Sequence, residues 1–348
     1  MKNMKILLAI LAIALVLGMT ACDDGGGSSG GNNGDGTSGG GGQNISEIFP
    51  AGGILSIAYG NNKFVAGGSS TMATSKDGIT WKAVNTLANT PLYGKNIFAI
   101  AHGDGKFVAA ASYYGNYFAY STDGVTWTAV EDSVIGKKGE DYDITAIAYG
   151  NGKFVAGGQN GKMAYSTDGA TWTAVPGSIF KYINTIAYGN GKFVAGGWDK
   201  MAYSTDGVTW TATDSKLGSI LAIAYGNDKF VAGGHDGQHG EMAYSTDGVT
   251  WTAVTGSTIA NLAGSSKIAY GNGKFVAAGL GKNMMVYSPD GITWTEVNNI
   301  TNPFYDDKSG IISAIAYGNG KFVAGGWNGK FQGEMGYSSD GINWTKVP

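Results

Sequence analysis

A serine, an aspartate and a tryptophan recur at fixed spacing along this chain. Residues 119–130 read AYSTDGVTWTAV, and the same twelve letters return at residues 243–254. A hydroxyl close to a carboxylate suits nucleophilic or acid–base chemistry, but the same pair also caps tight turns. The aspartates of this pattern are Asp77, Asp123, Asp168, Asp206, Asp247, Asp290 and Asp340. Catalytic carboxylates need individually tuned environments, whereas these copies are nearly identical. We therefore predict a structural role for them and no catalytic residue among them.

The spacing of the pattern indicates a tandem repeat. Its tryptophans are Trp81, Trp127, Trp172, Trp210, Trp251, Trp294 and Trp344, at intervals of 38 to 50 residues. A period of this length is typical of solenoids and propellers, in which each repeat is one supersecondary unit. The next question is which elements make up one unit.

The third unit shows the expected elements most clearly. Two β-rich runs at residues 144–150 and 153–158 flank Asn151 and Gly152, which is the strongest short-range hairpin signal. A third run ends at the Ser-x-Asp-Gly turn, and a fourth run contains the tryptophan. Seven such units predict an all-β fold, a single seven-bladed β-propeller of four-stranded antiparallel blades. We place this domain at residues 45–348, with blades at about 54–84, 97–130, 144–175, 183–213, 220–254, 266–297 and 312–348.

The motif SxDGxTW resembles the Asp-box (BNR) repeat, usually SxDxGxTW, of sialidases and many other propellers. The motif in this chain is one residue shorter between Asp and Gly. The resemblance implies a turn between the third and fourth strands of each blade. Sialidases hold the substrate carboxylate with arginines, and all 23 basic residues here are lysines. The resemblance therefore implies the fold and not the sialidase activity.

The start of the chain reads as an export signal. Lys2 and Lys5 precede a twelve-residue apolar run at residues 6–17, which is too short to span a bilayer. Residues 1–21 followed by Cys22 resemble a bacterial lipoprotein signal, which implies a lipid on Cys22. Residues 22–44 are rich in Gly and Ser, and a flexible tether of this length reaches about 25 Å. We expect a protein of the bacterial cell envelope that is exported and anchored to a membrane.

Residues that differ between units gather at one equivalent position, directly after the second strand. Its occupants are Ser69, Ser112, Gln159, Trp198, His235, Leu280 and Trp327. Loops that vary on a uniform scaffold are where binding sites are found. Aromatic rings beside amides suit stacking on sugars or anchoring a protein partner, although they also suit filling loops and the channel mouth. Our candidate ligand-binding residues are Trp198, Trp327, His235, Gln159, Tyr113 and Tyr114.

Other site chemistries are weaker in this sequence. His235, His239 and Glu241 lie in a glycine-rich loop without a visible fourth ligand, so we predict no metal and no cofactor. The net charge of −3, without a basic block, predicts no nucleic-acid partner.

We expect a monomeric, non-enzymatic binding scaffold for a glycan or a protein. One alternative is a glycosidase whose two carboxylates come from Glu131, Asp132, Asp199, Asp214, Glu241 or Glu334. The other is an assembly-factor scaffold, because photosystem-assembly propellers carry similar boxes.

Closure of the ring is the remaining question. The first unit begins at its inner strand and the last ends at its outer strand, so the chain ends share no obvious blade. We predict that residues 45–49 add a strand outside the last blade.

Overall fold

The structure is a computed structural model. It describes residues 42–85, 87, 90, 92–112, 116–130, 134, 143–198, 200–255, 263–280, 285–297, 304 and 310–348. The predicted signal at residues 1–21, Cys22, which we expect to carry a lipid, and most of the predicted tether lie outside these ranges, as do Tyr113 and Tyr114. None of the helices among these residues has both the length and the apolar character needed to cross a membrane.

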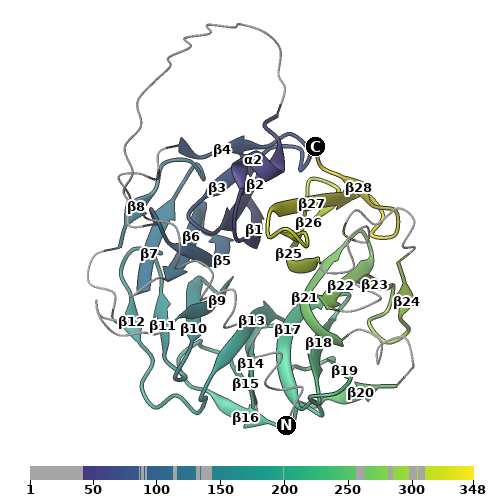
Figure 1. The fold of residues 1–348 in the computed structure, drawn as a ribbon. Coiled ribbons are helices and arrows are strands. Elements are labelled where there is room, and N and C mark those ends of the chain that lie inside the picture. Colours follow the sequence, from purple (N-terminus) through teal and green to yellow (C-terminus); the bar gives the residue numbers. More distant parts are fainter. Residues whose placement is uncertain are drawn as a thin grey trace, which may run out of the picture.

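Seven four-stranded antiparallel sheets stand around a central opening, which confirms the predicted propeller (Figure 1). In every blade the chain runs from the innermost strand to the outermost. Blade 1 contains β1 (Ile54–Gly60), β2 (Lys63–Gly68), β3 (Met72–Ser75) and β4 (Lys82–Ala83), and blade 2 contains β5 (Asn96–Gly103), β6 (Lys106–Ser112), β7 (Asn116–Ser121) and β8 (Thr128–Ala129). Blade 3 contains β9 (Ile144–Gly150), β10 (Lys153–Gly158), β11 (Met163–Ser166) and β12 (Thr173–Ala174).

The other four blades repeat this arrangement. Blade 4 contains β13 (Ile183–Gly189), β14 (Lys192–Gly197), β15 (Met201–Ser204) and β16 (Thr211–Thr213), and blade 5 contains β17 (Ser219–Gly226), β18 (Lys229–His235), β19 (Gly240–Ser245) and β20 (Thr252–Val254). Blade 6 contains β21 (Ala263–Gly271), β22 (Lys274–Leu280), β23 (Met285–Ser288) and β24 (Thr295–Glu296), and blade 7 contains β25 (Ile311–Gly318), β26 (Lys321–Trp327), β27 (Gly333–Ser338) and β28 (Thr345–Lys346).

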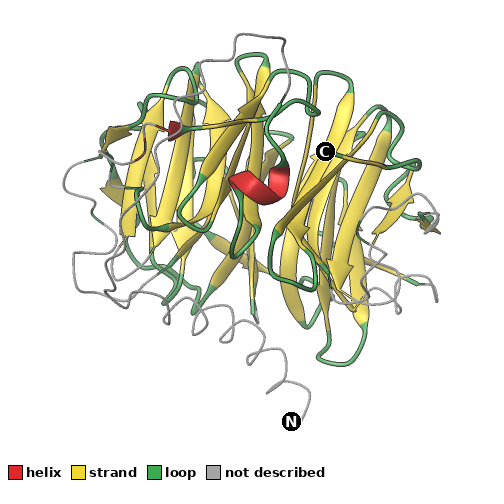
Figure 2. Ribbon diagram, turned by 45° about the horizontal axis from the view of Figure 1, so that its top comes forward, coloured by secondary structure: helices red, strands yellow, loops and turns green. Residues whose placement is uncertain are grey.

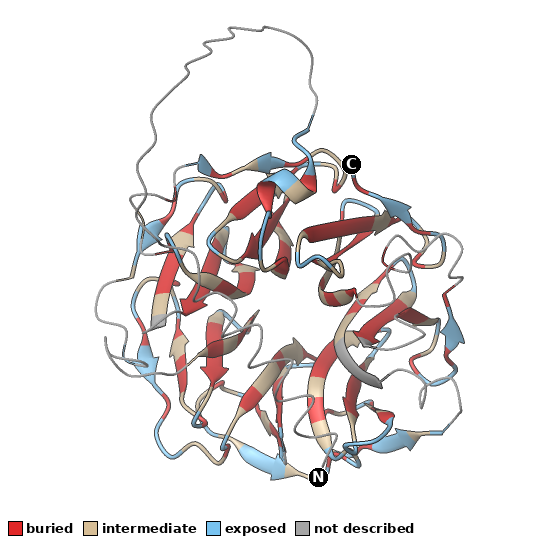
Figure 3. Cartoon of the chain, in the orientation of Figure 1, coloured by how far each residue is buried: buried red, intermediate tan, exposed pale blue. Residues whose placement is uncertain are grey.

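The inner hairpins turn as their sequence requires. Asn151 and Gly152 have φ angles of +46° and +71°, a region that asparagine and glycine tolerate best. The following strand, β10, is buried along nearly its whole length, because neighbouring blades cover both of its faces. The outermost strand β12 is exposed, and the rim of the ring shares this property (Figure 3). The core therefore lies between the sheets as seven similar layers.

Contacts between the innermost strands fix the spacing of the blades. The Tyr225 ring lies flat against Gly189 of the preceding blade, where an added Cβ would come within 2.0 Å of the ring. The same contact recurs around the ring, and Tyr59 against Gly318 closes it between blade 7 and blade 1. His102 takes the tyrosine position against Gly60. The Tyr-Gly dipeptide at the end of each inner strand, or His-Gly in blade 2, therefore links neighbouring blades, because the glycine of one blade contacts the aromatic ring of the next.

The prediction of a strand at residues 45–49 is wrong. This segment forms the short helix α2 (Ile45–Ile48), whose first turn is capped by the Asn44 side chain. Ile45 and Ile48 are three residues apart and both buried, which is helical spacing rather than the alternation of a strand. Phe49, which is fully buried, follows them into the core.

The segment before β1 nevertheless joins the first and last blades. The Ile45 N–H donates to the carbonyl of Pro348 (3.1 Å), and the Gln43 N–H donates to that of Trp81 (3.0 Å). The Phe49 ring lies beside Gly68 of blade 1, and the Phe49 carbonyl accepts from Gly333 of blade 7. Figure 2 shows α2 against the sheets at this seam. Ring closure thus relies on a helical plug and not on a shared strand.

Candidate functional site

The Asp boxes use their polar atoms internally. In blade 5 the Ser245 hydroxyl donates to Asp247 Oδ1 (2.9 Å) and accepts from the Gly248 N–H (2.8 Å). The same Oδ1 accepts from the N–H groups of Val249 and Thr250 at 2.8 and 2.7 Å. The six other boxes show the same pattern of partners. These atoms hold a turn together and are not directed at a ligand.

Electrostatics agree with that geometry. Burial raises the pKa of the Asp247 carboxyl, but the hydrogen bonds from Thr250, Val249 and Ser245 outweigh burial and lower the pKa to about 2. The other six box aspartates also have a pKa of about 2. A general acid or base at neutral pH needs a pKa close to the working pH. The seven carboxylates are therefore turn caps that are ionised at neutral pH.

Polar side chains of each inner hairpin reach the box of the next blade. Lys63 Nζ donates to the backbone carbonyl of Asp123 (2.7 Å), and Lys106 Nζ donates to that of Asp168 (2.9 Å). Asn319 Nδ2 donates to the carbonyl of Lys76 (3.1 Å), from blade 7 to blade 1. On the face that carries the boxes, neighbouring blades are thus joined by hydrogen bonds from hairpin side chains to backbone carbonyls.

An aromatic platform stands at the junction of blades 3 and 4. Trp198, directly after β14, is 52% exposed and stacks on Tyr182, with ring centroids 4.9 Å apart and planes 7° apart. Tyr182 pairs with Gln159 in an isolated antiparallel bridge, and Gln159 Nε2 donates to Asp143 Oδ2 (2.7 Å). We call Asp143, Gln159, Tyr182 and Trp198 the Trp198 platform. Two of the residues predicted from the sequence, Gln159 and Trp198, therefore lie in one cluster.

Tyr182 is held firmly within this platform. Its burial and the nearby Asp143 carboxylate raise the pKa of the phenol, while a hydrogen bond with Gln159 acts in the opposite direction. The phenol of the ring on which Trp198 rests therefore stays protonated at neutral pH.

The other predicted ligand-binding residues are placed elsewhere. Trp327 ends β26 and packs over Gly53, where an added Cβ would lie 2.7 Å from the Trp327 Cβ. It belongs to the seam at which the ring closes, across the opening from β14 (Figure 1). His235 ends β18 in blade 5, and its Nδ1 accepts from the Gly237 N–H (3.0 Å). The position after the second strand therefore does not form one continuous site.

The carboxylates considered for catalysis or metal binding already have partners where the structure describes them. Glu241 Oε2 accepts from the Gly218 N–H (2.8 Å), Asp214 pairs with Lys216, and Glu334 pairs with Lys346 (2.5 Å). Glu131, Asp132 and Asp199 lie outside the described residues. Within the described ranges, no group of three or more His, Cys, Asp or Glu side chains has the arrangement of a metal site.

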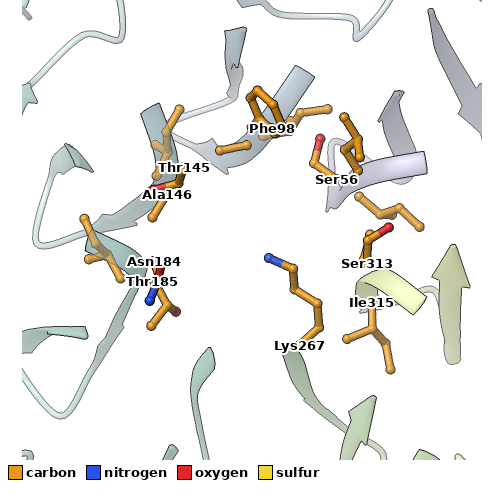
Figure 4. A pocket seen from close by; sticks show the side chains of 16 residues that line it. Ser56, Phe98, Thr145, Ala146, Asn184, Thr185, Lys267, Ser313 and Ile315 are labelled. Carbon is orange, nitrogen blue, oxygen red and sulfur yellow. The ribbon is translucent and has the colours of Figure 1, made fainter. Parts of the chain in front are cut away.

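A second feature, which sequence reasoning missed, is a cavity of about 220 Å³ in the central channel. The innermost strands β1, β5, β9, β13, β21 and β25 line it, mainly with isoleucine, alanine and small hydroxyl side chains. Lys267 of β21 is the one charged residue among the lining residues that the structure describes (Figure 4). The signal was present in the sequence, because the other units carry Ala, Ser or Thr at the equivalent position.

No family model and no curated protein sequence matches this chain. Several solved structures are similar to it. YCF48 bound to a D1 peptide is 15% identical with a TM-score of 0.59, covering 81% of this chain and 93% of that one. YCF48 from Cyanidioschyzon merolae is 16% identical with a TM-score of 0.59, over 86% and 96% of the two chains. At such low identity these similarities establish the shared fold.

A bacterial structure has the same fold. The extracellular domain of the putative one-component system BT4673 from B. thetaiotaomicron is 12% identical, with a TM-score of 0.60, over 83% of this chain and 39% of that one. The chain is thus a seven-bladed propeller similar to YCF48 and to this extracellular domain.

Proposed function

We propose that the protein is a non-enzymatic binding scaffold of the bacterial cell envelope, tethered through lipidated Cys22, that holds a glycan or a protein on the Trp198 platform. The observation that carries the proposal is the Trp198 ring, half exposed and yet fixed by face-to-face stacking on Tyr182. A ring that is already ordered loses little conformational entropy when a ligand covers it. Exposed tryptophan is also the residue type most enriched among binding hot spots.

The polar half of the platform favours a glycan as the first ligand class to test. Asp143 and Gln159 place a carboxylate and an amide, hydrogen-bonded to each other, beside a flat aromatic face, and sugars present hydroxyl groups around an apolar ring face. A protein ligand has separate support, because YCF48, which shares the fold, is known in a structure with a D1 peptide. That similarity also supports an assembly-factor role, which co-purification with a membrane complex would reveal.

The test is binding of the full-length protein to a glycan array and to solubilised envelope proteins. Trp198→Ala is the test variant, and Phe331→Ala is its matched control because Phe331 is 50% exposed in another blade. We expect Trp198→Ala to weaken binding by about tenfold or more, while Phe331→Ala binds as wild type. Equal binding by wild type and Trp198→Ala would overturn the assignment of the site.

The anchor and the absence of enzymatic activity need their own measurements. Cys22→Ser is expected to move the protein from the membrane fraction to the soluble fraction, and retention in the membrane fraction would contradict a lipid at this residue. Turnover of any member of a panel of chromogenic glycosides would instead favour the glycosidase alternative.

A further inference from the structure

Lys267 occupies a position at which the other blades place only small uncharged residues. It is the third residue of the segment SSKIAYG at residues 265–271, and its counterparts in the other six blades are Ser56, Ala99, Ala146, Thr185, Ala222 and Ala314. Most inner strands contain a bulge beside this position, and β21 contains two register shifts that end at Lys267. Bulges commonly re-aim side chains. Figure 4 shows the Lys267 side chain extending into the open cavity with its ammonium group foremost.

This ammonium group has no counter-ion in the described wall of the channel. None of the other lining residues is ionisable, and no hydrogen bond or ion pair joins Lys267 to a described residue. Lys267 is partly buried, and this burial lowers the pKa of its ammonium group. A partly desolvated and unpaired charge costs free energy in the folded state, and a bound anion would offset that cost.

One part of the wall presents hydrogen-bond acceptors. The Ser56 hydroxyl donates to the carbonyl of Ile97 (2.8 Å), and Ser313 donates to that of Ile54. Thr145 likewise donates to a carbonyl of the neighbouring inner strand. Because each of these hydroxyls has spent its single proton, its oxygen can only accept further bonds. A ligand that carries an anionic group and a hydrogen-bond donor therefore suits Lys267 together with these three oxygens.

We propose that the central channel binds a small hydroxycarboxylate, with its carboxylate on Lys267 Nζ and its hydroxyl donating to the oxygens of Ser56, Thr145 or Ser313. The cavity of about 220 Å³ is smaller than the ~300 Å³ at which sites for drug-sized ligands begin, and it has room for a ligand of few carbon atoms. Ile100, Ile147 and other isoleucines of the lining would cover its apolar part. This site is independent of the Trp198 platform.

Three probes that differ by one group each test the ligand chemistry on the full-length protein by calorimetry. Lactate carries both groups, propionate lacks the hydroxyl, and propane-1,2-diol lacks the carboxylate. We expect lactate to bind saturably, propionate to bind about threefold or more weakly, and the diol not to bind. Absence of saturable lactate binding at about 10 mM, ten times a Kd of 1 mM, would overturn the proposal. Equal binding of lactate and the diol would do the same.

Variants of the lysine test the role of this residue. Lys267→Met is expected to weaken lactate binding about tenfold or more and to raise Tm, because it replaces an unpaired cation by an apolar side chain. Lys267→Arg retains binding, and Lys82→Gln on the exposed strand β4 is the matched control with binding unchanged. Unchanged lactate binding in Lys267→Met would overturn the proposal, and a lowered Tm would assign Lys267 a structural role instead. Lactate binding by Trp198→Ala separates this site from the platform.

Discussion

Trp172 and Trp198 illustrate two environments of tryptophan in this molecule, one buried in the repeated turn and one exposed after a second strand. Trp172, in the Asp box of blade 3, is 5% exposed, stacks on Phe118 and donates from Nε1 to the Gly169 carbonyl (3.3 Å). Trp198, in the next blade, is 52% exposed and presents one face outward. Trp172, which belongs to the repeat, is buried in contacts that stabilise the fold. Trp198, which lies outside the repeated motif, keeps an exposed face that a ligand can contact.

The charged residues show the same contrast. Asp168 Oδ1 accepts bonds from Ser166, Ala170 and Thr171, so this oxygen of the repeated carboxylate is engaged within its own turn. Lys267 breaks the repeat in the inner strands and has no partner among the described residues. The repeated aspartates are bonded within their own turns and the repeated lysines to the next blade, whereas Lys267 and Trp198, which do not repeat, are our candidates for binding.

The largest effect expected from this comparison is the loss of a box tryptophan. Trp172→Ala should lower the free energy of unfolding by about 3–5 kcal/mol, because it removes a buried indole from between two blades. Trp198→Ala should change it by no more than about 0.5 kcal/mol, since half of its ring is already exposed. Urea unfolding of both variants measures the difference. Similar losses of stability in the two variants would contradict the distinction between a structural Trp172 and an exposed Trp198.

Removal of one box carboxylate should have a smaller effect. Asp247→Ala is expected to cost about 1 kcal/mol, comparable to loss of a helix N-cap, because two N–H groups lose their acceptor. The folded pKa of about 2 lies below the unfolded value of about 3.9. This stabilisation is therefore complete above pH 4 and is lost as the pH falls toward 2.

Asp247→Asn separates charge from geometry, since the amide oxygen still accepts both bonds. We expect this variant to retain much of the stability at pH 7 and to show a shallower loss between pH 4 and 2, measured by thermal unfolding across that range. A stability profile identical to that of the wild type across the acid range would contradict a structural role for the ionised carboxylate.

The smallest effect is expected at the one exception in the ring of tyrosines. Burial lowers the pKa of His102, so the folded state binds fewer protons than the unfolded chain. Stability from this residue is complete above the unfolded pKa of about 6.5 and is lost as the pH falls below it. His102→Tyr restores the residue of the other six blades, and we expect a change within about 0.5 kcal/mol at pH 7. Between pH 7 and 5 the variant should lose less stability than wild type in thermal melts, and equal losses would refute the assignment.

Much of the fold could be predicted because the same hairpin and turn motifs recur in all seven units of the sequence. A hairpin signal such as Asn151-Gly152 and a turn such as Ser245-x-Asp247-Gly248 are local, so their conformations depend on few other residues. Averaging over the repeats then identifies each strand. The segment at residues 45–49 occurs only once and was predicted as a strand, although the spacing of Ile45 and Ile48 was already helical.

The candidate site was less predictable, because it depends on contacts between blades. The sequence singled out Gln159 and Trp198. That both contact Tyr182 could not be predicted, because these contacts depend on how two neighbouring sheets are placed side by side. Trp327 occupies the same position of its blade but packs against Gly53, in the segment that leads into β1. Lys267 was visible as an exception to the repeat, yet only the ring geometry directs it into a channel.

The most direct test of this account compares ligand affinity in two variants of neighbouring blades. Once the array or pull-down has identified a ligand, its Kd is measured for Asp168→Ala and Trp198→Ala beside wild type at a temperature where all three are folded. We predict that Asp168→Ala binds within about twofold of wild type despite a lower Tm, while Trp198→Ala loses about tenfold or more with Tm unchanged. Loss of binding in Asp168→Ala with full stability, together with normal binding by Trp198→Ala, would place function in the repeated boxes and contradict the account.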